Sequence, residues 1–300
     1  MKTFSEEKQK NARIVREFSD NGQNCVEISY FGSFSVEKTF DCGQCFRFDR
    51  SDRARHESEF SGVAFGREVS FAQDGEHLYV YGSDGADFDN IWRHYLSLDV
   101  DYDAIDADIL SRSDTKALRD AVEYGKGIRI LRQDRWETVC SFIISQNNNI
   151  PRIKKIIAAM SERFGESIGG GSFAFPTAQA LNEAGESAIF ELKTGFRAKY
   201  IADAAARVCD GRLDLYSLDG DTDACVKKLC EVKGIGPKVA LCSLLFGFGK
   251  YDAFPVDVWI RRVTEKYFHE GFTPDELGAY AGIAQQYLFY YERYIIGKEN

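Results

Sequence analysis

The sequence lacks long apolar runs, fixed-period repeats and low-complexity tracts. Its longest apolar stretches, near residues 138–145 and 239–249, are shorter than the roughly 20 residues that a membrane-spanning helix needs. They predict buried core helices instead. The absence of repeats and heptads argues against fibrous and disordered classes. Residues 1–23 also lack the apolar segment of a secretory signal, so we expect a cytoplasmic protein.

What remains is an ordinary globular composition. With 300 residues, 44% of them apolar, the chain can bury a substantial core. Its length predicts two or three compact domains.

The eight cysteines form no complete metal site in the sequence. Cys42 and Cys45 have the spacing of a zinc or redox motif, but no second pair or suitably placed histidine accompanies them. Several other cysteines stand in apolar helical patterns, where a free thiol acts as a small hydrophobe. We interpret the spacing as coincidental and expect reduced thiols.

The net charge of −9 argues against a protein that coats nucleic acid. The distribution is uneven, because residues 126–155 contain seven lysines and arginines against two acidic residues. Acidic residues are concentrated at 99–108, which could face solvent away from a basic footprint. A solvated helix face is the alternative interpretation of the basic segment.

The hydrophobic periodicity predicts an α+β protein. Residues 25–82 contain short alternating segments, including FSVEKTF and CFRFDR, and Asp74-Gly75 is a hairpin signal between two of them. After residue 86 the spacing becomes three and four, which predicts helices, with a loop over 168–175. We expect an N-terminal twisted antiparallel sheet domain at 1–110, followed by an all-helical domain at 111–300.

The densest motif is the segment 229–240, LCEVKGIGPKVA, between two helical patterns. Gly234 and Gly236 permit a tight turn with positive φ, and Pro237 suits the first position of the next helix. The pattern predicts a helix-hairpin-helix whose exposed N–H groups bind a DNA phosphate.

Lys238 is a cation in the first turn of an almost entirely apolar helix. Desolvation and the helix dipole both favour the uncharged, nucleophilic amine. The alternative is a lysine that extends to solvent or binds phosphate. Asp257 precedes an amphipathic pattern and is a candidate N-cap of the helix that this pattern predicts. The fold could also bring its carboxylate beside Lys238, where it would stabilise positive charge on a sugar.

In these motifs the chain resembles the helix-hairpin-helix glycosylase superfamily, whose pattern joins the hairpin, a catalytic lysine and a following Pro-Val-Asp. Within it, the likeness is to the 8-oxoguanine DNA glycosylase family and covers nearly the whole chain. The motifs that carry it are CGQCFRF, GIRILRQDRWETVCSFIISQNNNIPRI, GFRAKY, GIGPKVALC, FPVDVW and YAGIAQQYLF.

The resemblance implies a bifunctional base-excision repair enzyme acting on 8-oxoguanine opposite cytosine in duplex DNA. Lys238 would attack C1′ and form a Schiff base, Asp257 would support the attack, and β-elimination would nick the strand. The Gly43 carbonyl would read the N7 proton that guanine lacks. The other implied contacts of the flipped base are Gln285 at its Watson–Crick edge, and Phe289 and Cys242 on its two faces.

Other implied residues act on the rest of the DNA. Asn147 would fill the hole left by the base, Arg152 and Arg197 would bind the orphaned cytosine, and Phe196 would be an aromatic wedge, a tyrosine in familiar members. On the residues alone, the asparagine run 147–149 is a helix cap and turn, and an isolated arginine is a phosphate contact.

The chain departs from the family pattern at two positions. Trp259 replaces a histidine near the phosphate of the flipped nucleotide, which puts that contact in doubt, and Leu241 replaces an acid found in some relatives. No cysteine follows Cys242, so we expect no iron–sulfur cluster. A cation bound by hairpin carbonyls near Val232 or Ile235 occurs in relatives. We expect no membrane association, and a monomer that associates with the nucleoid through DNA.

Three alternatives stay open. An alkylation-repair glycosylase shares the architecture and the aspartate but generally lacks the lysine nucleophile. A non-catalytic protein could use the hairpin only to bind phosphate, and the coexistence of Lys238 and Asp257 argues against it. A redox protein would rest only on Cys42 and Cys45, without a thioredoxin-like βαβ pattern.

Overall fold

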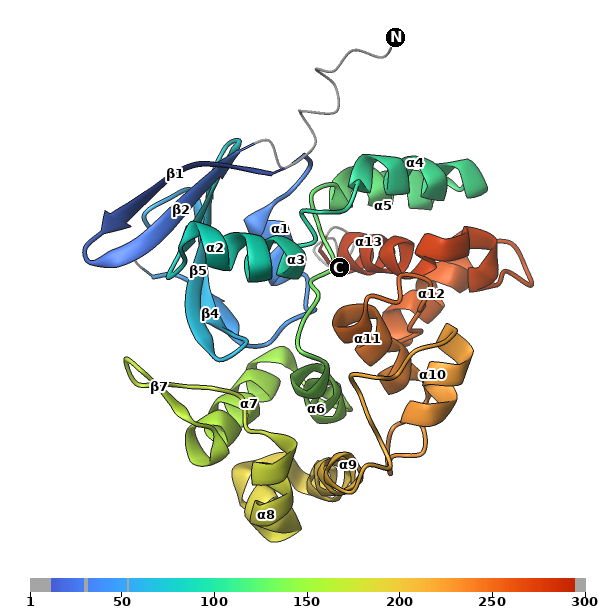
Figure 1. The fold of residues 1–300 in the computed structure, drawn as a ribbon. Coiled ribbons are helices and arrows are strands. Elements are labelled where there is room, and N and C mark those ends of the chain that lie inside the picture. Colours follow the sequence, from blue (N-terminus) through green and yellow to red (C-terminus); the bar gives the residue numbers. More distant parts are fainter. Residues whose placement is uncertain (1–11, 30–31, 53, 295–300) are drawn as a thin grey trace.

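The computed structural model describes residues 12–29, 32–52 and 54–294. A six-stranded antiparallel sheet forms one side of the molecule and helices form the rest (Figure 1). The strand order is β1-β2-β6-β5-β4-β3. The strands are β1 (Arg13–Asp20), β2 (Gln23–Ser29), β3 (Phe48–Arg50), β4 (Ser58–Ala64), β5 (Arg67–Asp74) and β6 (His77–Tyr81). The predicted α+β class and antiparallel sheet are confirmed.

Tight turns with positive φ connect the hairpins of this sheet. Asn21 and Gly22 join β1 to β2, and Phe65 and Gly66 join β4 to β5. Two-residue turns of this kind match the twist of the flanking strands and favour Asn-Gly. Gly75, with φ 53°, lies in the predicted turn between β5 and β6.

Three local predictions were wrong or incomplete. FSVEKTF does not form a strand: Ser35 caps a short helix, α1 (Val36–Asp41), and its side chain accepts from the Lys38 N–H. Strand β1 lies before the predicted start of the sheet. Residues 168–175 contain a two-stranded hairpin, β7 (Ser167–Gly169) with β8 (Ser172–Phe173), rather than a plain loop.

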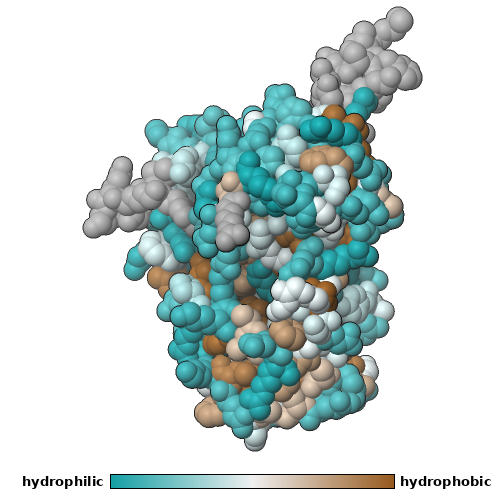
Figure 2. Space-filling view, turned by 90° about the vertical axis from the view of Figure 1, so that its left-hand side faces the viewer, coloured by the Kyte–Doolittle hydropathy of each residue, from teal (hydrophilic) through white to brown (hydrophobic). Residues whose placement is uncertain are grey.

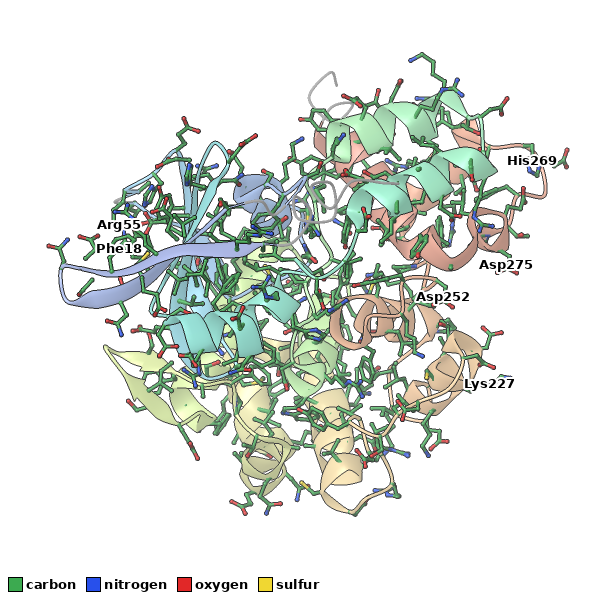
Figure 3. The ribbon with its side chains drawn as sticks, turned by 45° about the horizontal axis from the view of Figure 1, so that its top comes forward. Phe18, Arg55, Lys227, Asp252, His269 and Asp275 are labelled. Carbon is green, nitrogen blue, oxygen red and sulfur yellow. The ribbon has the colours of Figure 1, made fainter. Side chains whose placement is uncertain are left out.

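The two faces of the sheet are covered differently. Its inner face packs Val26, Ile28 and Phe71 against α1 and the aromatic residues of the next helical segment. The outer face is covered by its own polar and aromatic side chains, among them Phe18 and Arg55 (Figure 3). Seen from the side of the sheet, the surface is mostly hydrophilic with small apolar patches (Figure 2).

Most of the remaining helices follow the predicted periodicity, and α2, α4, η2 and η3 are additions. They are α2 (Gly85–Asp87), η1 (Phe88–Trp92), α3 (Arg93–Tyr95), α4 (Tyr102–Arg112), α5 (Lys116–Gly125), α6 (Arg135–Ser145), α7 (Ile150–Phe164), α8 (Ala178–Ile189), η2 (Phe190–Thr194), η3 (Gly195–Arg197), α9 (Ala198–Cys209), α10 (Thr222–Leu229), α11 (Pro237–Phe248), α12 (Val258–Tyr267), η4 (Pro274–Tyr280) and α13 (Ala281–Tyr294). Among the described residues, no helix is long and apolar enough to cross a membrane.

The C-terminal helix α13 lies centrally in the helical part. It packs along α5 and contacts α12, so segments from residues 116 and 281 onward lie side by side (Figure 1). One large apolar core joins α4 through α13 and also includes Cys42 and Phe46 from the loop after α1. The loop of residues 42–47 therefore lies between strands of the sheet in the sequence, but two of its side chains pack in the core of the helical part. The boundary at 110/111 stays a prediction.

Candidate active site

Lys238 stands in the first turn of α11, which begins at Pro237 after the N-cap Gly236. The following residues of the helix are buried, but Lys238 itself is exposed. The expected desolvation of its amine is therefore wrong for the protein without DNA. Lys238 is one of the residues that line a cavity.

Cys242 lies one helical turn after Lys238 and is 4% exposed. Burial raises the pKa of its thiol, the charge of Lys238 and a hydrogen bond with it act in the opposite direction, and Asp257 adds to the increase. Lys238, Cys242 and Asp257 are thus close enough to influence one another electrostatically.

Asp257 is the N-cap of α12, and its Oδ1 accepts from the Ile260 N–H at 2.8 Å. The carboxylate is half-buried and also lines the cavity beside Lys238. The structure therefore combines the two uses expected for this residue, because the capping bond fixes the carboxylate at the cavity.

This cavity brings together all six residues predicted to act on the sugar or the base. Gly43 reaches it from the loop after α1, Lys238 and Cys242 from α11, and Asp257 from the start of α12. Gln285 and Phe289 reach it from one face of α13. Its other lining residues are Cys42, Phe142, Phe246, Pro255 and Gln286. Residues separated by more than 240 positions thus form one concave site of the kind that binds small ligands.

Gly43 has φ 82°, a conformation that side chains rarely adopt. A Cβ there would also contact Arg293 and Phe289. The residues that hold this loop were not predicted. Gln286 donates to the Cys42 carbonyl at 3.0 Å, and the Gln44 side chain, 1% exposed, donates to the Thr39 carbonyl at 2.8 Å.

A second set of hydrogen bonds joins the Gly43 loop to the segment before α6. Gln44 donates to the Arg129 carbonyl and accepts from the Leu131 N–H, both at 2.8 Å. No local sequence pattern marks these contacts, because they join residues at least 85 positions apart.

Gln285 is 4% exposed, and its Oε1 has no hydrogen-bond partner. Leaving a buried carbonyl oxygen unpaired costs about 1–3 kcal/mol. An acceptor in this state at a cavity wall is suited to a ligand that brings N–H donors. Phe289, one turn later on α13, provides an apolar surface beside it.

The hairpin between α10 and α11 is present as predicted, but its two glycines differ. Gly234 has φ 77°, whereas Gly236 is extended at φ −99° and the expectation of positive φ there was wrong. A Cβ on Gly234 would overlap the Tyr200 ring, and a Cβ on Gly236 would meet nothing within 4 Å. Gly236 therefore leaves the helix start open to a close approach by a ligand.

The asparagine run connects α6 to α7. Asn148 donates to the Ile144 carbonyl at 3.1 Å, and Asn149 caps α7 by accepting from the Arg152 N–H at 3.0 Å. Asn147 is exposed, with φ 47°, at the tip between them. The predicted C-capping of α6 is made by the Asn148 side chain, whereas Asn149 is the N-cap of α7, and Asn147 is exposed in the turn.

Arg197 is 3% exposed and binds backbone around this turn. It donates to the carbonyls of Gln146 (Nε, 2.9 Å), Asn147 (3.0 Å) and Thr194 (3.1 Å). Burial lowers the pKa of Arg197, and the charge of Arg152 lowers it further. Arg197 thus holds the turn after α6 to the segment before α9 through its hydrogen bonds. Arg152, in contrast, is exposed.

Phe196 is 46% exposed and stacks under the Arg197 guanidinium, 4.4 Å from the ring centroid. An exposed aromatic ring beside an exposed asparagine is consistent with a surface that contacts nucleobases. Asn147, Arg152, Phe196 and Arg197 therefore form a second cluster, apart from the cavity.

Comparisons with known proteins agree with this geometry. Residues 29–139 match the family model of the 8-oxoguanine DNA glycosylase N-terminal domain, and residues 140–277 match that of the HhH-GPD superfamily base excision DNA repair proteins. An N-glycosylase/DNA lyase from Saccharomyces cerevisiae is 31% identical over 272 residues, 80% of this chain and 72% of that protein. This chain belongs to the 8-oxoguanine DNA glycosylase family.

Solved structures of the glycosylase family include two that resemble this one. The apo form of Clostridium acetobutylicum 8-oxoguanine glycosylase/lyase has a TM-score of 0.85 at 37% identity, covering 94% of this chain and 99% of that chain. Its complex with double-stranded DNA containing cytosine opposite 8-oxoG has a TM-score of 0.81 at 37% identity, covering 93% and 98%.

The basic segment 126–155 of this glycosylase is only partly a solvated face, the interpretation that its charge run favoured. Four of its side chains bind the protein itself: Arg129 to the Ser97 carbonyl, Arg132 to Asp99, Arg135 to the Leu215 carbonyl and Lys154 to Asp49. Exposed cations that remain are Lys126, Arg152 and Lys155. Asp99 is exposed, as expected, and also pairs with Arg132.

The departures and cysteines of the glycosylase can also be placed. Trp259 is 38% exposed on the first turn of α12, with the Arg262 guanidinium 5.6 Å from its ring. Leu241, the other departure, is half-buried on α11. The cysteines are free thiols, Cys42 and Cys45 included. Burial raises the pKa of Cys42 to about 12. Within the described ranges, no group of three or more His, Cys, Asp or Glu residues could hold a metal.

Proposed function

We propose that this glycosylase flips 8-oxoguanine from opposite cytosine in duplex DNA, excises it through a Lys238 Schiff base and then nicks the strand. The observation that carries the proposal is the single cavity lined by Lys238, Asp257 and the four base-contacting candidates. The proposed nucleophile, the carboxylate and the candidate base contacts thus line one cavity.

In the proposed chemistry, the uncharged Nζ of Lys238 bonds to C1′, and the electron pair of the glycosidic bond leaves with the base. Asp257 stabilises the positive charge that develops on the sugar. Opening of the ring gives the Schiff base, and β-elimination then breaks the bond to the 3′ phosphate. Because Lys238 is exposed before binding, we expect the DNA to create the dry environment that electrostatic stabilisation requires.

Recognition of the lesion rests on two acceptors. The Gly43 carbonyl would accept from N7–H, which 8-oxoguanine has and guanine lacks. The unpaired Oε1 of Gln285 would accept from the Watson–Crick edge. A site with buried acceptors rejects ligands that lack the matching donors, because those acceptors then stay unpaired. Phe289 and Cys242 would enclose the base plane.

The second cluster would act on the DNA around the lesion. Asn147 would occupy the space of the extruded base, Phe196 would wedge the stack, and Arg152 with Arg197 would bind the orphaned cytosine. Arg152 is exposed, so its guanidinium is open to a ligand. Arg197 already donates to three carbonyls, so its contact would be made by a guanidinium fixed in advance.

The hairpin supplies the phosphate contact. The open backbone at Gly236 and the N-terminus of the apolar helix α11 suit an anion, and Gly234 shapes the turn. Cation binding by carbonyls near Val232 and Ile235 stays a prediction, as does the absence of an iron–sulfur cluster. Dependence of DNA affinity on the type of monovalent cation at constant ionic strength tests the cation, and iron analysis tests the cluster.

The remaining proposals concern context. A monomer that acts in the cytoplasm on nucleoid DNA is consistent with a reaction confined to one cavity. An alkylation-repair activity is disfavoured by Lys238, and a binding-only role by Lys238 beside Asp257.

Borohydride trapping on a duplex with 8-oxoguanine opposite cytosine tests the proposal. We expect a covalent adduct with the wild type and none with Lys238→Gln. Lys227→Gln is the matched control, because Lys227 is an exposed lysine on the neighbouring helix α10 (Figure 3). If the wild type is not trapped and releases no base, the catalytic proposal fails. If Lys238→Gln is trapped as well, another amine is the nucleophile.

A further inference from the structure

Tyr200 lies between two parts of the proposed DNA surface that have separate functions. On one side its ring packs against Gly234 of the hairpin so closely that a Cβ there would overlap it. On the other side it meets the Phe196 ring edge-on, with centroids 5.8 Å apart at 69°. One half-buried side chain therefore contacts both the phosphate-binding turn and the wedge.

The contacts continue beyond Phe196. The Phe196 ring stacks with the guanidinium of Arg197, which in turn donates to the carbonyl of Asn147. A continuous series of contacts thus joins the hairpin to the residue expected to replace the extruded base.

Helix α9, which carries Tyr200, has a second attachment to the hairpin. The Asp203 carboxylate accepts from the Lys233 N–H at 2.9 Å and pairs with Arg207, also at 2.9 Å. Tyr200 and Asp203 stand three residues apart, on one face of α9. The hairpin turn is therefore fixed to this face at two successive residues, Lys233 and Gly234.

We propose that Tyr200 is a positioning residue that couples phosphate binding at the hairpin to insertion of Phe196 and Asn147. This inference rests on the proposed function, because it assumes extrusion of a base. The aromatic ring performs the role, since both contacts are made by its carbon atoms. Proximity alone does not establish coupling, which has to be measured between the two ends.

Two reactions separate positioning from general structure. Excision of 8-oxoguanine requires extrusion, whereas strand nicking at a preformed abasic site has no base to extrude but uses the same Lys238. Tyr200→Leu should slow single-turnover excision by about 10- to 100-fold, as misplacement of a reacting group does. It should leave nicking at the abasic site near the wild-type rate. 2-Aminopurine fluorescence next to the lesion should show slower extrusion.

The controls follow from the contacts. Tyr200→Phe keeps the ring and should restore excision. Tyr216→Leu removes a 62% exposed tyrosine elsewhere on the helical part and should change neither rate. Thermal unfolding verifies the fold of each variant. If Tyr200→Leu does not fold, Asp203→Ala removes the other attachment and must produce the same separation of the two rates.

A double-mutant cycle measures the coupling at the hairpin. Gly234→Ala places a methyl group against the ring, so its effect on excision should be smaller in the Tyr200→Leu background than in the wild type. The proposal is overturned if both reactions slow by the same factor, if Tyr200→Phe is as slow as Tyr200→Leu, or if the two effects are additive. An active wild type with unaffected variants overturns this inference alone, whereas an inactive wild type overturns the proposed function.

Discussion

Asp257 accepts a hydrogen bond from the Ile260 N–H at 2.8 Å and is thereby the N-cap of α12. The same carboxylate lines the cavity beside Lys238. The residue thus has a structural role and a proposed catalytic role that different substitutions can separate. Asparagine caps a helix about as well as aspartate, whereas alanine does not.

Asp257→Asn should reduce excision of 8-oxoguanine by about 100-fold, since the stabilising charge is lost. Its free energy of unfolding should change little. Asp257→Ala should lose excision and in addition about 1 kcal/mol of stability. Single-turnover kinetics and urea unfolding measure the two effects. Equal loss of stability in both variants would contradict the capping role, and normal excision by Asp257→Asn would contradict the electrostatic one.

Gln285→Met should weaken lesion recognition without weakening the fold. Methionine has a similar length and removes a buried carbonyl oxygen that has no partner. The free energy of unfolding should therefore be unchanged or slightly larger. Excision should slow by about 10-fold or more through loss of one hydrogen bond to the base. Nicking at an abasic site, which has no Watson–Crick edge, should be unaffected. A parallel loss of both activities would place Gln285 outside base recognition.

Gly234→Ala should mainly lower stability, whereas Gly236→Ala should mainly weaken DNA binding. Gly234 has φ 77° and packs on Tyr200, so alanine there should lower the free energy of unfolding by more than about 1 kcal/mol. Gly236 has an extended backbone and open space around it, so alanine should be tolerated in folding. It should weaken DNA binding, because a methyl group would stand where the phosphate approaches. Thermal unfolding and fluorescence anisotropy with duplex DNA distinguish these outcomes.

Alkaline pH should destabilise the protein through its buried thiols. Burial raises the pKa of Cys42 from its ordinary 9.0 to about 12. Between these values the folded chain keeps a proton that the unfolded chain releases, so the free energy of unfolding falls as pH rises. The maximum slope is about 1.4 kcal/mol per pH unit for one such group.

Cys42→Ala should therefore flatten the dependence of Tm on pH above about pH 9. Cys209→Ala is the control, because Cys209 is the exposed cysteine among those described. An unchanged slope in Cys42→Ala would mean that this thiol ionises equally in the folded and unfolded chains.

Much of this architecture could be predicted from local patterns. The helical periodicity after residue 86, the hairpin turn at Gly75 and the N-cap position of Asp257 depend on neighbours within a few residues, and the structure has them. The likeness to a glycosylase family then brought together Gly43, Lys238 and Gln285, which the cavity joins.

The failures arose where distant contacts decide the structure. FSVEKTF alternates like a strand, but Ser35 caps a helix there, and the Val36 N–H binds the Gln73 side chain on β5 at 2.9 Å. The basic segment gave no sign that four of its side chains bind the protein itself, because their acidic and carbonyl partners, such as Asp99, lie elsewhere in the sequence. The missed β1 did have a local signal, the Asn21-Gly22 turn.

The attachment of the Gly43 loop has a consequence for how this enzyme can be divided. The loop comes from residues 29–139, the part matched by the N-terminal family model, yet Gln286 of α13, which lies outside that part, donates to the Cys42 carbonyl and holds the loop in place. A helical fragment produced alone would keep Lys238 and Asp257 but lack Gly43, the residue proposed to distinguish the lesion from guanine. An exchange of segments between two relatives would have to move this loop together with α13, because Gln286 holds it.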